Sequence, residues 1–139
     1  MSYISKAEFI EELGKAAGIT GNEAVQDAAL SRGWIEKQDI READKDISRF
    51  EAARIAHMFL LKEKHTEDLA DISGAEILRD LYDCRVCVNH VAQVFLRGLI
   101  GPRDLPGVTM GSFLIFDGRD RLRKEEAKLL FENLGKIGC

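Results

Sequence analysis

The chain has 139 residues and a mass of 15.6 kDa, close to the commonest size of a single domain, so we predict one domain over residues 1–139. Its 20 basic and 24 acidic side chains are interleaved and leave a net charge of −4, which argues against a nucleic-acid partner. A hydrophobic fraction of 45% excludes a disordered chain, and the apolar runs are too short to span a membrane.

Two helices are predicted in the first quarter of the chain. Residues 5–17 carry apolar side chains at helical spacing, and Gly18 ends this helix. A second helix is predicted to end at Gly33. Trp34 follows that glycine, where apolar residues usually fold back onto the helix they leave, so Trp34 is predicted to lie in the core.

An acidic segment precedes the strongest helix signal. Residues 36–45 are predicted to form a solvated acidic loop; a calcium loop is the alternative, but no frame supplies both the glycine and the final glutamate of an EF-hand. The next helix is predicted from Ser48 to Lys64. Ser48 and Glu51 have the spacing of a capping box, in which each side chain accepts the backbone N–H of the other residue.

The second half of the chain mixes helices with a long connection. Helical segments are predicted at 75–82 and 83–99, with a break between them because valines lower helix propensity. Glycine and proline punctuate the loop 100–121, in which 112–116 is the one strand signal. A last helix is predicted over 123–134. The expected fold class is therefore mainly α, with at most one short β element.

A short pattern recurs at three of these helix starts. It consists of an apolar residue, a capping residue, a cation, any residue and Glu, followed by an apolar helical stripe. The three copies are Ile4-Ser5-Lys6-Ala7-Glu8, Ile47-Ser48-Arg49-Phe50-Glu51 and Leu122-Arg123-Lys124-Glu125-Glu126, and in the third copy Arg123 replaces the capping hydroxyl. The pattern predicts a helical pseudo-repeat, with a partial leading unit at 1–18 and two units at 19–64 and 65–139.

Further motifs accompany these helix starts. The segment 65–139 contains, in order, Leu69-Ala70-Asp71-Ile72, Gly98-Leu99-Ile100, Gly111-Ser112-Phe113 and Leu122-Arg123-Lys124-Glu125-Glu126-Ala127. The preceding unit contains Gly33-Trp34-Ile35 and Ile47-Ser48-Arg49-Phe50-Glu51-Ala52, without the first and third motifs. In this order the motifs resemble the S-layer homology (SLH) family, whose repeats run from Phe-x-Asp-Val through a Gly-apolar-Ile helix end and a Gly-Thr-Phe loop to Ile-Thr-Arg-Ala-Glu.

The resemblance implies a function and a set of binding residues. SLH modules attach bacterial surface proteins to anionic, pyruvylated cell-wall polysaccharide in grooves between their repeats. The family's ligand-facing arginine corresponds to Arg49, and to Lys6 and Lys124 with lysine in its place; the opening aspartate corresponds to Asp71. A cation at a helix N-terminus favours anion binding there, although these cations could equally be solvated first-turn residues.

Metal binding and catalysis are less favoured interpretations. Cys84, Cys87, His90 and Cys139 are the candidate zinc ligands, and the Cys-x-x-Cys pair could also be redox-active. Because the pair lies in an apolar helical stretch, we expect both cysteines to be small buried hydrophobes and expect no metal or cofactor. No nucleophile motif is present and no partner is signalled for any histidine, so we expect no enzyme.

The sequence leaves two functional hypotheses. The first is a non-catalytic module that binds anionic cell-wall polysaccharide. The second is an intracellular protein-interaction or assembly domain with the same architecture, which includes self-association into homo-oligomers. The first residues lack the pattern of a signal peptide, so the chain as written is expected in the cytoplasm; the same segment released from a secreted precursor would lie at the cell surface.

Overall fold

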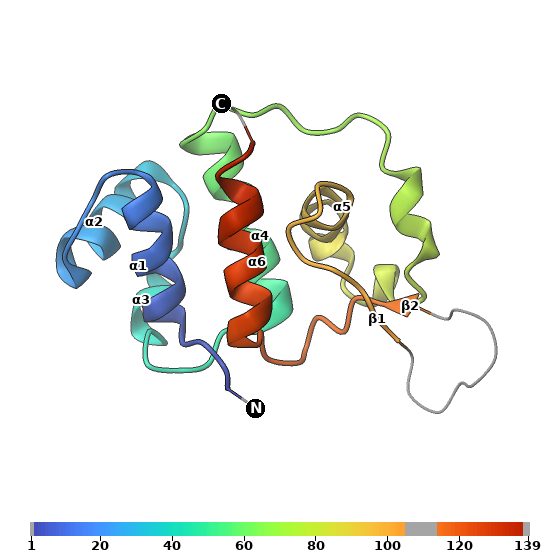
Figure 1. The fold of residues 1–139 in the computed structure, drawn as a ribbon, viewed down its shortest axis with the longest axis horizontal. Helices are drawn as coiled ribbons and strands as arrows, with labels where there is room; N and C mark the ends of the chain where they lie inside the picture. The colour runs from blue at the N-terminus through green and yellow to red at the C-terminus, as the bar shows by residue number, and fades with distance from the viewer. Residues whose placement is uncertain (1, 105–113, 138–139) are drawn as a thin grey trace.

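The computed structural model describes residues 2–104 and 114–137 and confirms a mainly helical fold with one short β element (Figure 1). Short 3-10 turns at 73–77, 81–83 and 85–87 lead into α5. The elements are α1 (Lys6–Ala16), α2 (Asn22–Arg32), α3 (Lys37–Arg41), α4 (Arg49–Lys62), α5 (Val88–Leu96), β1 (Arg103–Asp104), β2 (Leu114–Ile115) and α6 (Lys124–Leu134). The strands pair antiparallel, with Arg103 opposite Ile115.

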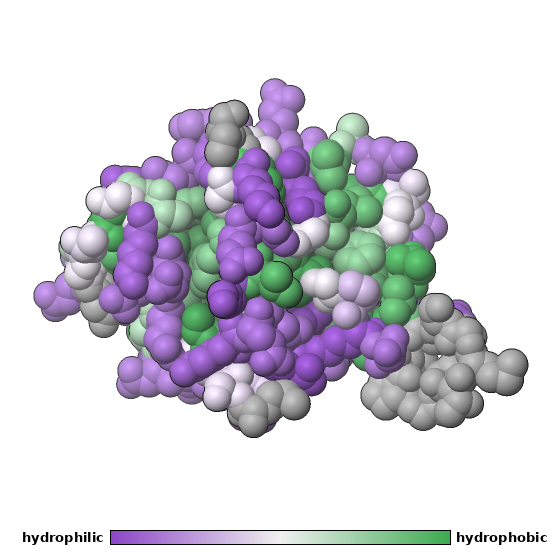
Figure 2. All heavy atoms as spheres, in the orientation of Figure 1, coloured by the Kyte–Doolittle hydropathy of each residue, from purple (hydrophilic) through white to green (hydrophobic). Residues whose placement is uncertain are grey.

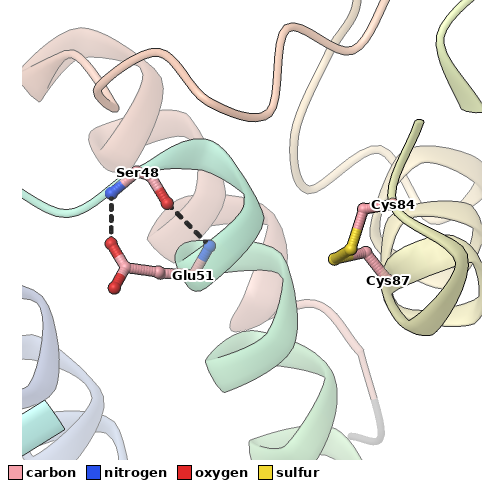
Figure 3. The surroundings of a disulfide bond; sticks show 4 residues. All are labelled: Ser48, Glu51, Cys84 and Cys87. Carbon is pink, nitrogen blue, oxygen red and sulfur yellow. Dashed lines mark hydrogen bonds between the residues drawn. A yellow bond between two sulfur atoms is a disulfide. The ribbon is translucent and has the colours of Figure 1, made fainter. Parts of the chain in front are cut away.

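All three copies of the repeated pattern begin helices. In α4 the Ser48 hydroxyl accepts the Glu51 N–H at 3.1 Å, and the Glu51 carboxylate accepts the Ser48 N–H at 2.9 Å (Figure 3). The same reciprocal pair starts α1, at Ser5 and Glu8. In α6 the Glu126 carboxylate accepts the N–H of the capping position. The reciprocal capping predicted at Ser5 and Ser48 is therefore confirmed, and α6 keeps the hydrogen bond to Glu126.

The three helix starts meet in a closed ring of backbone hydrogen bonds. Ile4 donates to the carbonyl of Leu122 at 3.3 Å, Leu122 to that of Ile47 at 2.9 Å, and Ile47 to that of Ile4 at 3.0 Å. All three side chains are buried. The first residue of each helix also donates its backbone N–H to a carbonyl of a neighbouring segment. These pairs are Lys6 to Lys45, Arg49 to Asp120 and Lys124 to Ser2. The repeated patterns thus occupy equivalent places around a pseudo-threefold axis.

The other helices pack around these three. α2 contacts α1, and α5 contacts α4, on opposite sides of the molecule (Figure 1). Trp34 is fully buried, with its ring edge-on to Phe59 at 4.6 Å between centroids, which confirms its predicted place in the core. Phe9 of α1 meets Phe131 of α6 at 5.2 Å, so one core joins the helices on both sides of the axis.

Several local predictions differ from the structure. The segment 36–45 is not simply a solvated loop, since it contains α3 and the buried Asp39. The helix predicted at 75–82 consists of 3-10 turns, and the helix predicted at 83–99 is shortened to α5. The predicted strand appears as β2, whereas residues 112 and 113 lie outside the described part of the chain. β-Branched side chains around Cys87 disfavour a longer α5.

Candidate functional site

The first helix-start cation, Lys6, is enclosed by carboxylates. Its side chain is 2% exposed, and its Nζ donates to Asp39 at 3.1 Å and to Glu42 at 2.9 Å and also pairs with Glu51. Burial opposes the charge on Lys6, but the hydrogen bonds to Glu51, Glu42 and Asp39 outweigh it and hold the pKa of Lys6 above its usual value. The charge of Lys6 is therefore neutralised within the protein.

The second cation, Arg49, is fully buried. Its Nε donates to the carbonyl of Phe116 at 2.7 Å, and its two terminal nitrogens donate to the Glu126 carboxylate and the Gly101 carbonyl. Burial lowers the pKa of Arg49, and the nearby Glu126 partly offsets this. Since all three guanidinium nitrogens have partners, Arg49 links α4 to α6 and to the connection between them.

A rule relates these two ion pairs. The cation of each helix start pairs with the capping glutamate of the next start around the axis, in the pairs Lys6 to Glu51 and Arg49 to Glu126. The same rule would pair Lys124 with Glu8. Lys124 is exposed, however, and within the described residues it has no ion pair. The third helix start therefore lacks the ion pair that the other two starts have.

Lys124 and Glu8 both line a groove between α6 and α1. The groove has a volume of about 460 Å³ and is lined by Ile4, Glu8, Glu11, Glu12, Lys15, Lys124, Ala127, Lys128, Phe131 and Glu132. α2 and α3 lie between α1 and α4 in sequence, and α5 and the sheet lie between α4 and α6. Among the described elements none connects α6 to α1, which leaves this groove uncovered.

The groove combines charge with an apolar strip. Four glutamates and three lysines line it, together with the half-buried Phe131 and the buried Ile4 and Ala127. Figure 2 shows hydrophobic residues between the hydrophilic side chains of the α1 and α6 region. Such a surface can bind a ligand that carries both an anionic group and an apolar face.

The predicted ligand residue Asp71 lies apart from these cations. It is exposed and accepts the N–H and the hydroxyl of Ser73, at 3.0 and 2.7 Å, and these hydrogen bonds lower its pKa. Asp80, which the sequence analysis did not single out, accepts the N–H groups of Phe116 and Asp117 at 2.7 and 2.8 Å. Leu78-Arg79-Asp80-Leu81 has the same apolar-x-Asp-apolar pattern as Leu69-Ala70-Asp71-Ile72, so the sequence contained a second candidate for this position.

A second residue missed from the sequence is Arg103 of β1. Its guanidinium pairs with Asp117 at 3.0 Å, with Glu126 at 2.8 Å and with Asp120. Burial opposes its charge, but the hydrogen bonds that Arg103 donates to these carboxylates outweigh burial and raise its pKa. Arg103 and Arg49 both donate to Glu126, so this carboxylate is the partner of two cations.

The cysteine prediction requires correction. Cys84 and Cys87 are not free buried thiols in a helix, since they form a disulfide in the turn before α5 and are half-buried (Figure 3). Within the described chain no three His, Cys, Asp or Glu side chains come together as a metal site. The fourth candidate ligand, Cys139, lies outside the described residues.

Comparisons with known proteins do not assign this site. No family model, curated protein or solved structure matches the chain. Over residues 2–104 and 114–137, no helix has both the length and the apolar character needed to cross a bilayer. The function of the groove has to be inferred from its geometry and from the motifs that line its edges.

Proposed function

We propose that the chain is an attachment module whose groove between α6 and α1 binds anionic cell-wall polysaccharide. The observation that carries this proposal is the exposure of Lys124. Of the three equivalent helix-start cations, all within the described residues, Lys124 alone is exposed, and its charge has no carboxylate partner in the described chain. The resemblance to the SLH family, in which this cation faces the ligand, points to the same position.

The surroundings of Lys6 and Arg49 indicate which atoms Lys124 can bind. Oxygen atoms surround the equivalent cations: carboxylates around Lys6, and a carboxylate with two backbone carbonyls around Arg49. A pyruvyl carboxylate on a polysaccharide would supply the same atoms to Lys124. The positive end of the α6 dipole lies at the same place and favours an anion.

The remaining groove residues suit a sugar. Phe131 offers an apolar surface to a sugar ring, and Glu8 and Glu11 can accept hydrogen bonds from sugar hydroxyls. Arg49 and Lys6 then hold neighbouring helices together and do not contact the ligand. Attachment of this kind needs neither catalysis nor a cofactor, and it places the protein at the bacterial cell surface.

Retention on purified pyruvylated cell-wall polysaccharide tests the proposal. Lys124→Gln removes one charge-assisted hydrogen bond and should weaken binding about tenfold or more, since such bonds contribute about 1.5–3 kcal/mol. Lys37→Gln, a change of the same kind at an exposed residue of α3, should leave binding unchanged. Failure of the wild-type protein to bind, or equal binding by the two variants, would rule the proposal out.

A second candidate is an interaction domain whose open groove takes a polypeptide segment. Two observations favour it: oxygen atoms of the polypeptide surround the other two helix-start cations, and four glutamates against three lysines give the open groove a net negative charge. The partner segment would place a carboxylate on Lys124. If the partner is a second copy of this chain, light scattering will show a concentration-dependent dimer that Lys124→Glu disrupts while the polysaccharide retains no protein.

A further inference from the structure

The Cys-x-x-Cys pair occupies an accessible turn at the start of a helix. The disulfide between Cys84 and Cys87 closes the 3-10 turn that runs directly into α5. Val86, between the two cysteines, is 87% exposed, and Tyr82 nearby is 64% exposed. The sulfur atoms lie on the side of the turn that faces the first turn of α4 (Figure 3). A helix N-terminus stabilises a thiolate, which is the reactive form of cysteine.

Cys87 shares a cavity with a histidine. The cavity has a volume of about 360 Å³ and is lined by Glu36, Phe50, Glu51, Arg54, Val86, Cys87 and His90. Cys87 and His90 are three residues apart at the start of α5, a spacing that places side chains next to each other. The cavity therefore brings an ionisable ring to the disulfide.

His90 ends a chain of hydrogen bonds that begins at a carboxylate. The Nε2 of His57 in α4 lies 2.6 Å from Asp68, and its Nδ1 lies 2.7 Å from Nδ1 of His90. His57 is 3% exposed, and Asp68 also accepts the Asn89 amide at 2.9 Å. These contacts link α4, α5 and the segment between them.

The carboxylate determines which ring nitrogens carry protons. Asp68 can only accept, so with both rings neutral His57 donates from Nε2 and accepts at Nδ1. His90 must then donate from Nδ1, which leaves a lone pair on its Nε2. Burial, and to a smaller extent the neighbouring His57 and Arg54, lower the pKa of His90 to about 4, so beside the intact disulfide the ring is neutral near pH 7 and its Nε2 lone pair is free of a proton.

We propose that Cys84 and Cys87 form a redox-active pair that exchanges with protein dithiols and disulfides, with His90 as the base for the Cys87 thiol. This activity is separate from the α6–α1 groove and does not depend on the function proposed for it. The exposed Val86 and Tyr82 would contact the partner polypeptide.

A partner dithiol supplies the electrons and protons for reduction of the disulfide. Its thiolate attacks Sγ of Cys84, the bond between Cys84 and Cys87 breaks, and Cys87 leaves as a thiolate. The partner's second thiolate then attacks the mixed disulfide and releases Cys84. The partner becomes a disulfide, and its two electrons and two protons end on the cysteine pair. In the reverse direction Cys87 gives its proton to His90 Nε2, where the negative thiolate that forms favours the protonated ring, and the Cys87 thiolate attacks the mixed disulfide.

Reduction of insulin disulfides by dithiothreitol tests the activity. The assay uses the full chain with Cys139→Ser, so that Cys84 and Cys87 are the only cysteines that can take part in the reaction. This variant should raise the rate several-fold over dithiothreitol alone, and adding Cys84→Ser should abolish the increase. Circular dichroism melting establishes that both proteins are folded. No increase with the folded Cys139→Ser protein, or an equal increase in both proteins, would overturn the proposal and leave the disulfide a structural staple.

The pH dependence of alkylation tests the role of His90. In the reduced protein, iodoacetamide should modify Cys87 well below the pH of about 8.5 at which a free thiol ionises. The charged and titratable groups around the site are Glu36, Glu51, Arg54, His57, Asp68 and Arg85. His90→Asn should move the profile toward that of a free thiol, and the matched His65→Asn, at an exposed residue outside the cavity, should not. Identical profiles for both variants would remove His90 from the mechanism.

Discussion

Asp39 is the carboxylate that joins α1, α3 and α4. It is 1% exposed and receives hydrogen bonds from Lys6, from both terminal nitrogens of Arg54 at 3.0 and 2.6 Å, and from the N–H of Glu36 at 2.9 Å. Burial raises the pKa of Asp39, but the hydrogen bonds from Arg54 and Glu36 more than compensate, so the pKa lies below its usual value. The ionised form is therefore part of the folded state.

Asp39→Asn should lower the free energy of unfolding by about 3 kcal/mol at pH 7, because it removes the carboxylate that pairs with Arg54 and one of the three carboxylates around Lys6. The native pKa is depressed, so the wild-type advantage is complete above the unfolded pKa of about 3.9 and is lost as the pH falls through the native value. Urea unfolding from pH 7 down to about pH 2 should show this decline. Asp27→Asn on the exposed face of α2 is the control. A difference that stays constant across this range would contradict the assignment.

The contact between α1 and α2 depends on a glycine inside a helix. A Cβ on Gly14 would lie 2.6 Å from both Cγ atoms of Val25, closer than two carbon atoms can approach. Glycine within a helix costs about 0.5–1 kcal/mol relative to alanine. Its presence at this position allows α2 to approach α1, and Val25 cannot easily rotate away because its side chain is β-branched.

Gly14→Ala should therefore lower stability by about 1–3 kcal/mol instead of raising it, since overpacking outweighs the gain in helix propensity. Val25→Ala should remove the clash, so the two substitutions should compensate each other in a double-mutant cycle. Chemical denaturation of the two single variants and the double variant measures the coupling. Stabilisation by Gly14→Ala alone would show that α2 does not pack as closely as described.

Across the molecule, the three helix starts form one ring of hydrogen bonds, and two of their three cations are enclosed by the chain itself. The ring joins residues 4, 47 and 122, and each enclosed cation pairs with a carboxylate of the next helix start and with oxygen atoms of the intervening segment. The same arrangement that stabilises two interfaces leaves Lys124 free of an ion pair in the described structure. The groove between α6 and α1 is open because, among the described elements, no segment connects these two helices as segments connect the other two pairs.

Local patterns predicted the elements better than they predicted the environment of the cations. The capping box at Ser48 is encoded within four residues, so sequence alone located the start of α4. The burial of Arg49 depends on Glu126, 77 residues later, and its exposure could not be inferred from its own helix. The hydrogen bonds of His57 to Asp68 and His90 likewise depend on partners 11 and 33 residues away. Such long-range pairings leave no periodic signal in the sequence.

The location of the ligand can be measured directly by following backbone amide signals of ¹⁵N-labelled protein during titration with a soluble fragment of pyruvylated cell-wall polysaccharide. We expect the signals that move to cluster in residues 8–15 of α1 and 124–132 of α6, on the two sides of the open groove. Signals around Arg49 should remain in place because that cation is enclosed. Movement centred on Arg49 or α5, with α1 and α6 unchanged, would contradict binding in the groove at Lys124.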